Sequence, residues 1–169
     1  QNILGEIDRG WYVAMTLLDF ERTGITHPAA GRRILEMLVQ YASETTINGK
    51  SIASNPIIRG KLADIAISLE TTRLQAYHVT WMQSEGLVPN MEASMLRLLS
   101  TQTSQRLARV GMEVLGMKGQ LEKTSKYTPL QGFIENQYLF SVPYTIESGS
   151  QEIQRNVVAT RGLGLPRGA

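Results

Sequence analysis

The chain has 169 residues, 42% of them hydrophobic, and a formal net charge of only +2 at pH 7. This size and composition are typical of one globular domain with a sizeable core, and the small net charge, with basic and acidic residues interspersed, argues against a nucleic-acid-binding surface. There is no cysteine, which excludes disulfide bonds and thiolate chemistry, and no apolar run reaches the roughly 18 residues that a membrane-spanning helix needs.

The first part of the chain has the period of about 3.6 residues that marks amphipathic helices. Asp8 can cap a first helix in which apolar residues recur at about every fourth position as far as Leu18. The segment 23–28 contains a glycine and a proline, which both weaken a helix, and it predicts a break or a kink. The apolar pattern then resumes over 34–41 and indicates a second helical stretch.

Two long helices are predicted in the middle of the chain. An irregular loop ends at Asn55 and Pro56, a good N-cap and first-turn pair, and the residues that follow suit an amphipathic helix from about 56 to 84. Glycine and proline between 86 and 89 end this helix. Another long helix is expected over 90–115, where a segment with two glycines stops it.

Two shorter helices fit 130–141 and 150–161, and strand-like alternation is confined to 142–146. Long and short helices joined by tight connections predict an all-α fold of the up-down four-helix-bundle type. A bundle of this kind hosts many functions, so the function has to come from local motifs.

Few side chains outside the C-terminal stretch suggest chemistry. Glu21 follows an apolar run and precedes Arg22, and a carboxylate in that setting is expected to be partly desolvated, which suits a general base. The alternative is a solvated Glu–Arg pair at a helix end with no chemical role. His27 and His78 stand far apart in sequence, without the close partner that a zinc site needs, so no metal is expected.

The stretch 147–167 combines a loop of small residues, an amphipathic helix and a tail rich in glycine and proline. Such a loop leaves backbone N–H groups exposed at a helix start, where a polar or anionic ligand can bind. As an ordinary helix start, the same residues provide a cap in Ser150 and, in Glu152, an acidic side chain that favours the positive end of the helix dipole.

Two stretches resemble the acyl-CoA dehydrogenase family. The run Glu-Ser-Gly-Ser-Gln-Glu-Ile-Gln-Arg-Asn-Val-Val-Ala-Thr-Arg, residues 147–161, resembles the family's C-terminal signature Glu-Gly-Gly-Thr-Ser-Glu-Ile-Gln-Arg-Asn-Ile-Ile-Ala-Glu-Arg, and Gly10–Arg22 looks like the opening helix of the same domain. The resemblance spans essentially the whole chain and implies that 1–169 form the C-terminal helical domain. Because the sequence begins at Gln1 without methionine, we expect a piece of a larger protein, with N-terminal helical and middle β domains missing here.

The resemblance implies an FAD-dependent acyl-CoA dehydrogenase, which introduces a double bond between Cα and Cβ of an acyl-CoA thioester. In this family a carboxylate removes the α-proton while the flavin accepts the β-hydrogen as hydride. The resemblance further implies electron-transfer flavoprotein as electron acceptor and a homo- or hetero-oligomer, and cytoplasmic is the default location. The isolated chain is expected to be inactive, because the missing middle domain covers the flavin.

The resemblance also assigns a base. In the isovaleryl- and long-chain branch the base is the Glu of a Leu-Asp-x-Glu-Arg motif, which corresponds to Glu21, and the flanking Asp19 and Arg22 correspond to contacts with CoA. In the medium- and short-chain branch the base is the Glu of Tyr-Glu-Gly-Thr, a position that holds Ser148, one residue after Glu147. A serine without a neighbouring general base cannot remove a carbon-bound proton, so Glu21 is the expected base and Glu147 the reserve.

Cofactor contacts are expected in the loop before the last helix. Gly149 and Ser150 match the family positions near the flavin, and Ser150 keeps the hydroxyl of the family's threonine. Glu152 follows in the first turn of the helix and is included among the cofactor-binding residues.

Two other cofactor loops match the family only in part. Of the motif Arg-x-Gln-Phe-Gly-Lys-Pro, whose Arg and aromatic residue hold the FAD of the neighbouring subunit, Gly49 and Lys50 are present, and the segment that begins at Gly116 half matches the Gly-Gly-x-Gly loop. Without the Arg, a bidentate donor for the cofactor's phosphates is missing. This suits a heteromeric enzyme in which a partner subunit completes the site. The alternatives are a non-catalytic subunit that acts as an assembly module and a plain helical interaction protein.

Overall fold

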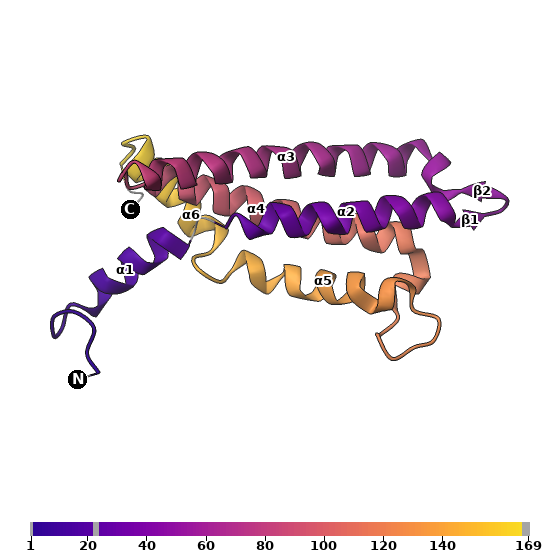
Figure 1. The fold of residues 1–169 in the computed structure, drawn as a ribbon, viewed down its shortest axis with the longest axis horizontal. Coiled ribbons are helices and arrows are strands. Elements are labelled where there is room, and N and C mark those ends of the chain that lie inside the picture. The colour runs from indigo at the N-terminus through magenta and orange to yellow at the C-terminus, as the bar shows by residue number, and fades with distance from the viewer. Residues whose placement is uncertain (1, 22–23, 167–169) are drawn as a thin grey trace.

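The computed structural model describes residues 2–21 and 24–166, with residues 19–21 described through their backbone only. It is an elongated bundle of helices with α1 and α6 at one end and a short hairpin at the other (Figure 1). The helices are α1 (Gly10–Glu21), α2 (Thr26–Glu44), α3 (Pro56–Ser84), α4 (Asn90–Leu115), α5 (Phe133–Ser141) and α6 (Gln151–Val157), and the hairpin is formed by β1 (Thr46–Ile47) and β2 (Lys50–Ser51). Within this described part, no helix is both long and apolar enough to cross a membrane.

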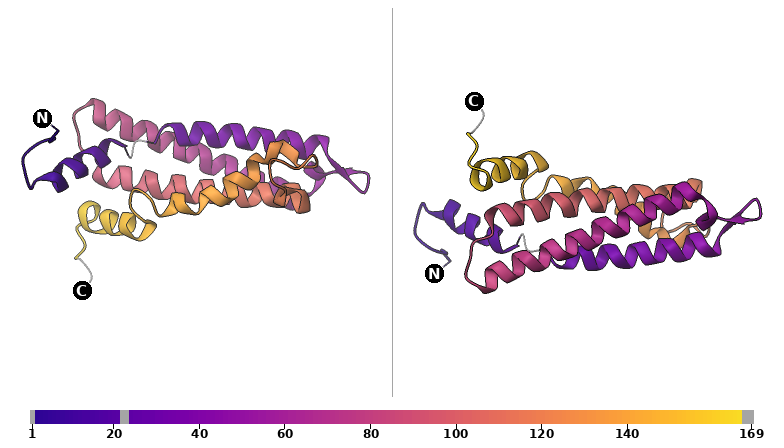
Figure 2. Two further views of the ribbon diagram at one scale, coloured as in Figure 1. Left: turned by 90° about the horizontal axis from the view of Figure 1, so that it is seen from below. Right: turned by 90° about the horizontal axis from the view of Figure 1, so that it is seen from above.

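The four helices α2 to α5 lie side by side along the bundle (Figure 2). Their shared core contains the fully buried side chains of Leu38 from α2, Ile65 from α3 and Ile134 from α5. Helix α4 contributes Leu107 and Val114 to the same core. Burial of these apolar side chains away from water holds the helices together, and the predicted all-α four-helix bundle is confirmed.

The long helix α3 begins and ends where the sequence predicts. The side chain of Asn55 accepts a hydrogen bond from the backbone N–H of Ile57 at 2.9 Å, and Pro56 occupies the first turn, where its missing N–H has no helical partner to lose. The helix ends at Ser84, and Gly86 then adopts a positive φ of 71°, a conformation that glycine tolerates.

The connections differ from the sequence-based prediction. Residues 142–146 do not form a strand, because Pro143–Thr145 is a 3₁₀ turn, and the strand pair instead lies at 46–51 in the loop expected to be irregular. The break expected over 23–28 is shorter than predicted, since α2 begins at Thr26. Pro28 therefore lies in the first turn of a helix, where proline is tolerated.

The two shorter helices are also shorter than predicted. Helix α5 starts at Phe133, because Leu130 and Gln131 before it have positive φ angles of 50° and 55° and cannot belong to a right-handed helix. Helix α6 ends at Val157 and continues as a π-helical turn over Val158–Gly162. The start of α2 lies at the same end of the bundle as the loop before α6, because His27 packs against Tyr144.

Candidate active site

The loop before α6 is held in an unusual backbone conformation. Ser148 and Gly149 have positive φ angles of 53° and 97°. The side chain of Gln154, which is fully buried, donates from its amide to the carbonyl oxygens of Ser148 at 3.1 Å and Gly149 at 3.4 Å. A Cβ on residue 149 would lie 2.6 Å from the Gln154 amide nitrogen, so only glycine fits without displacing this contact. The Gln154 side chain on α6 therefore holds the loop that precedes this helix.

Ser150 caps this helix, as the sequence predicts. Its hydroxyl oxygen accepts a hydrogen bond from the backbone N–H of Ile153 at 3.5 Å. A hydrogen bond from its own backbone N–H lowers the pKa of Glu152, and the Ser150 hydroxyl and the nearby charge of Arg155 lower it further. Glu152 is thus a solvated anion in the first turn, where the helix dipole favours negative charge.

Arg97 joins helix α4 to the same loop. Its guanidinium donates to the carbonyl oxygens of Tyr144 at 3.0 Å and Glu147 at 2.9 Å, and lies 3.8 Å from the Glu147 carboxylate. The Arg97 side chain is only 10% exposed and also packs over the Tyr144 ring, with 5.4 Å between the guanidinium carbon and the ring centroid. One largely buried cation therefore donates to two loop carbonyls.

His27, at the start of α2, packs against the same tyrosine. The His27 and Tyr144 rings meet edge to face, with centroids 5.3 Å apart and an interplanar angle of 87°. Burial lowers the pKa of His27, the Arg97 charge lowers it further, and the Glu147 carboxylate opposes them. Burial and the Arg97 charge therefore favour the neutral imidazole, which packs between α2 and the loop.

The side chain of Glu21, the expected base, lies outside the residues that the structure describes. The same holds for the side chain of Asp19 and for the whole of Arg22. The backbone of α1 ends at Glu21, and His27 brings the beginning of the next helix against the loop that carries Glu147. Glu21, on α1, and Glu147, in the loop before α6, thus both belong to the same end of the bundle (Figure 1).

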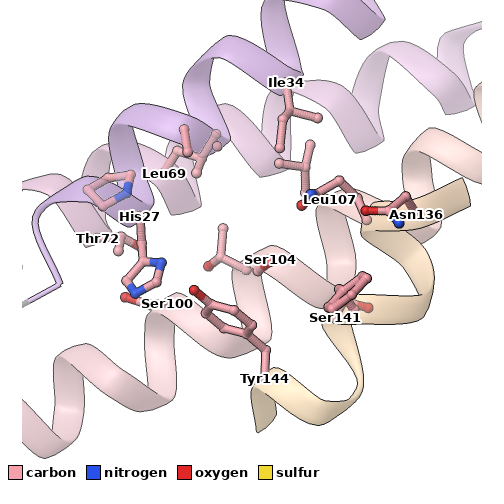
Figure 3. Close-up of a pocket in the computed structure, with 16 residues that line it drawn as sticks. His27, Ile34, Leu69, Thr72, Ser100, Ser104, Leu107, Asn136, Ser141 and Tyr144 are labelled. Atoms are coloured by element: carbon pink, nitrogen blue, oxygen red, sulfur yellow. The ribbon is translucent and has the colours of Figure 1, made fainter. Parts of the chain in front are cut away.

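A cavity of about 380 Å³ opens beside this loop, among helices α2, α3, α4 and α5 (Figure 3). Its walls mix apolar side chains with hydroxyl, amide and imidazole groups. Leu69 and Leu107 provide apolar surface, whereas His27, Ser100 and Tyr144 contribute polar atoms near the loop. A cavity of this size and mixed lining has the character of a small-molecule site.

The other expected cofactor residues lie at the opposite end of the bundle (Figure 1). A second cavity, of about 850 Å³, is lined both by the β1–β2 hairpin and by the segment after α4. Lys50, Gly116 and Lys118 are among its lining residues. Gly49, at the tip of the hairpin, and Gly116 both have positive φ and open space where a Cβ would lie. The structure therefore brings the hairpin and the Gly116 segment together, and separates both from Gly149 and Ser150.

Sequence reasoning missed the residues that hold the loop, namely Arg97, Gln154, His27 and Tyr144. A signal for Arg97 was present, because a lone arginine within the apolar run 95–99 indicates a charge that needs a buried partner. Gln154 belongs to the run that resembles the family signature, which assigns it no contact. Its partners, and the pairing of His27 with Tyr144, depend on contacts between distant segments that periodicity does not reveal.

Comparison with known proteins gives consistent relatives. The family described as "Acyl-CoA dehydrogenase, C-terminal domain" matches residues 8–163. The chain is 31% identical over 169 residues to acyl-CoA dehydrogenase IpdE1 of Mycobacterium tuberculosis, covering 99% of this chain and 41% of that protein. It is 26% identical over 161 residues to CarC, a subunit of the caffeyl-CoA reductase-Etf complex of Acetobacterium woodii, covering 94% of this chain and 40% of that protein.

A solved structure shows the same arrangement of helices. The crystal structure of the ChsE4-ChsE5 complex from Mycobacterium tuberculosis matches with a TM-score of 0.86 and 27% sequence identity, over 97% of this chain and 43% of that chain. In each of these comparisons the present chain spans about two fifths of the length of the protein that it matches.

Proposed function

The chain belongs to the acyl-CoA dehydrogenase family, whose C-terminal domain it forms, and we propose that the whole protein is an FAD-dependent enzyme that desaturates an acyl-CoA thioester between Cα and Cβ. The match of residues 8–163 to the family's C-terminal domain carries this proposal. The isolated chain would be inactive, since it spans about two fifths of its relatives.

In this proposal Glu21 removes the α-proton. The α-hydrogen of a thioester is only weakly acidic, so the base has to be a carboxylate held close to Cα and shielded from water. Glu21 is the last residue of α1 and follows an apolar run within that helix. The next helix, α2, packs against the Tyr144 ring through His27. Asp19 and Arg22 flank Glu21 and would contact the CoA part of the substrate, where Arg22 could pair with a phosphate.

The contacts of the reserve candidate favour this assignment. The Glu147 carboxylate lies 3.8 Å from the Arg97 guanidinium, and its backbone carbonyl accepts a hydrogen bond from the same group. Arg97 thus gives Glu147 a structural partner. Ser148, which occupies the base position of the medium- and short-chain branch, cannot take a carbon-bound proton on its own.

The residues present fit FAD in two places. Gly149 and Ser150, which match the family positions near the flavin, would lie against its edge, and Glu152 follows in the first turn of the helix. At the opposite end, Lys50 and Lys118 line the larger cavity beside Gly116 and could neutralise phosphates of a cofactor held by a neighbouring subunit. FAD bound in such an enzyme would accept the β-hydrogen as hydride.

The direct test uses the full-length protein. Purified enzyme that contains FAD should lose its absorbance near roughly 450 nm when an acyl-CoA substrate reduces the flavin, and electron-transfer flavoprotein, the acceptor we propose, should restore it. Omission of the thioester serves as the control. A flavin that stays oxidised with straight-chain, branched and cyclic acyl-CoA thioesters alike would remove the dehydrogenase assignment.

A second candidate is a subunit that needs a partner, or that only assembles with one. The solved ChsE4-ChsE5 neighbour is a complex of two named components. In the present chain the hairpin loop keeps only Gly49 and Lys50 of the family's cofactor motif. Flavin absorbance is measured on the full-length protein alone, and then after co-purification with a dehydrogenase subunit encoded by a neighbouring gene. The comparison separates the two candidates. Flavin bound without any partner would exclude partner dependence.

A further inference from the structure

The cavity among α2, α3, α4 and α5 begins at the group of side chains that holds the loop before α6. His27 and Tyr144 both line it, and Tyr144 is the residue whose carbonyl Arg97 holds (Figure 3). Because His27 and Tyr144 join this cavity to the loop before α6, the distal part of an acyl group whose thioester lies at that loop can enter it. The cavity volume of about 380 Å³ is within the range of sites that bind small organic groups.

One buried hydroxyl in this cavity has no hydrogen-bond partner within the described residues. Ser100, on α4, is only 7% exposed, lines the cavity, and its hydroxyl makes no hydrogen bond. Other buried hydroxyls nearby are satisfied by the carbonyl four residues earlier, as Ser94 is by Asn90 at 2.9 Å and Thr101 is by Arg97 at 3.0 Å. Ser100 therefore departs from the local pattern.

A buried hydroxyl without a partner costs free energy, and native proteins seldom retain one unless a ligand or water completes it. The rest of the lining is suited to a ligand that is partly polar. Asn136 and Gln137 on α5 add amide groups, whereas Leu69, Leu107 and Phe140 supply apolar surface. An unsubstituted alkyl chain would use the apolar surface but would leave Ser100 unsatisfied.

We propose that this cavity receives the distal part of the acyl group, and that this acyl group carries a ketone or hydroxyl oxygen that hydrogen-bonds to Ser100. The inference rests on the proposed dehydrogenase function, since it names the substrate class of that site. A serine hydroxyl can donate to a ketone oxygen and can either donate to or accept from a hydroxyl, so both groups fit. The thioester end stays at the loop before α6 and the oxygen function lies deeper in the bundle.

The test measures binding separately from turnover. The probes are octanoyl-CoA and the octanoyl-CoA thioesters that carry one ketone each, at the fifth, sixth or seventh carbon of the chain. Kd is measured by calorimetry with the full-length holoenzyme, and flavin reduction is followed in parallel. We expect at least one ketone position to bind about tenfold more tightly than octanoyl-CoA, the effect of one satisfied buried hydrogen bond.

Two variants locate the effect. S100A should remove the preference for the ketone over octanoyl-CoA, whereas S94A, at a buried serine outside the cavity lining, should keep the preference. Thermal unfolding of both variants shows whether they fold.

The outcomes separate this inference from the dehydrogenase function. A preference for a ketone that depends on Ser100, without flavin reduction, would support the binding site and reject the proposed function. Flavin reduction by all the thioesters with equal affinity would support the function and overturn the inference, because water then completes Ser100. Absence of binding by every thioester would overturn both.

Discussion

The guanidinium of Arg97 donates a hydrogen bond to the backbone carbonyl of Glu147 at 2.9 Å and lies 3.8 Å from the carboxylate of the same residue. These contacts connect helix α4 to the loop that precedes α6. The Arg97 side chain is one-tenth exposed, whereas that of Glu147 is about half exposed, so solvent screens the ion pair, and the hydrogen bond to the carbonyl is the shorter of the two contacts. Arg97 therefore fixes the path of the loop mainly through carbonyl groups.

Replacement of Arg97 by methionine should destabilise the protein. The substitution keeps apolar bulk but leaves the carbonyls of Tyr144 and Glu147 without their donor, which costs about 2 kcal/mol in the free energy of unfolding. Urea denaturation of the wild type and R97M measures this difference. R106M is the matched control, because Arg106 is exposed and its contact with the Ser68 hydroxyl is long, at 3.4 Å, so its effect should stay within about 0.5 kcal/mol. Equal stability of the two variants would show that Arg97 does not hold the loop.

Glu21 and Glu147 can be distinguished by matched substitutions in the full-length enzyme. If Glu21 is the base, E21Q should lower turnover by at least about 100-fold, because a positioned base contributes that much or more. E147Q should change turnover by no more than about threefold, since a glutamine oxygen can still accept from Arg97. Both variants should retain FAD, measured by flavin absorbance. Loss of activity in E147Q with an active E21Q would make Glu147 the base.

The bundle could be predicted from the sequence because its signals are local. The bounds of α3 follow from the Asn55–Pro56 pair and from Gly86, and the apolar residues of α4 recur at helical spacing over 90–115. The capping role of Ser150 also follows from its position directly before the helix. Each of these predictions depends on neighbouring residues only.

The contacts that build the site could not be predicted because they join distant parts of the chain. Arg97 and Glu147 are fifty residues apart, and His27 meets Tyr144 across an even longer separation. The hairpin at 46–51 was missed because its strands have two residues each, which is too short for an alternating pattern. The strand-like run at 142–146 contains a proline that instead starts a 3₁₀ turn.

Gly149 should be far less tolerant of alanine than Gly49. Both have a strongly positive φ, 97° and 75°, so both substitutions carry the backbone strain of about 1 kcal/mol that a non-glycine residue meets there. At Gly149 the new Cβ would also lie 2.6 Å from the Gln154 amide, whereas at Gly49 nothing lies within 4 Å. The G149A variant should therefore unfold at lower urea concentration than G49A. Equal midpoints for the two variants would show that the Gln154 contact does not constrain the loop.

His27 should make the stability of the protein depend on pH near neutrality. Burial lowers the pKa of His27 in the folded state below its ordinary value of 6.5, with Arg97 adding to this effect and Glu147 opposing it. The unfolded chain therefore binds a proton at this residue more readily than the folded one. Stability from the neutral imidazole is fully present above about pH 6.5 and is lost as the pH falls from there through the folded pKa.

The H27Q variant tests this directly. Between pH 7.5 and 5.5, roughly one unit on either side of the unfolded pKa, the free energy of unfolding should fall less steeply in H27Q than in the wild type, because glutamine takes up no proton. H78Q is the matched control, since His78 lies on the exposed face of α3, stacked on Trp81 and outside the cavity lining. Urea denaturation at a series of pH values gives the slopes. If the wild type and H27Q have the same slope, protonation of His27 is not coupled to folding, and its ring contributes to the bundle only through packing against Tyr144.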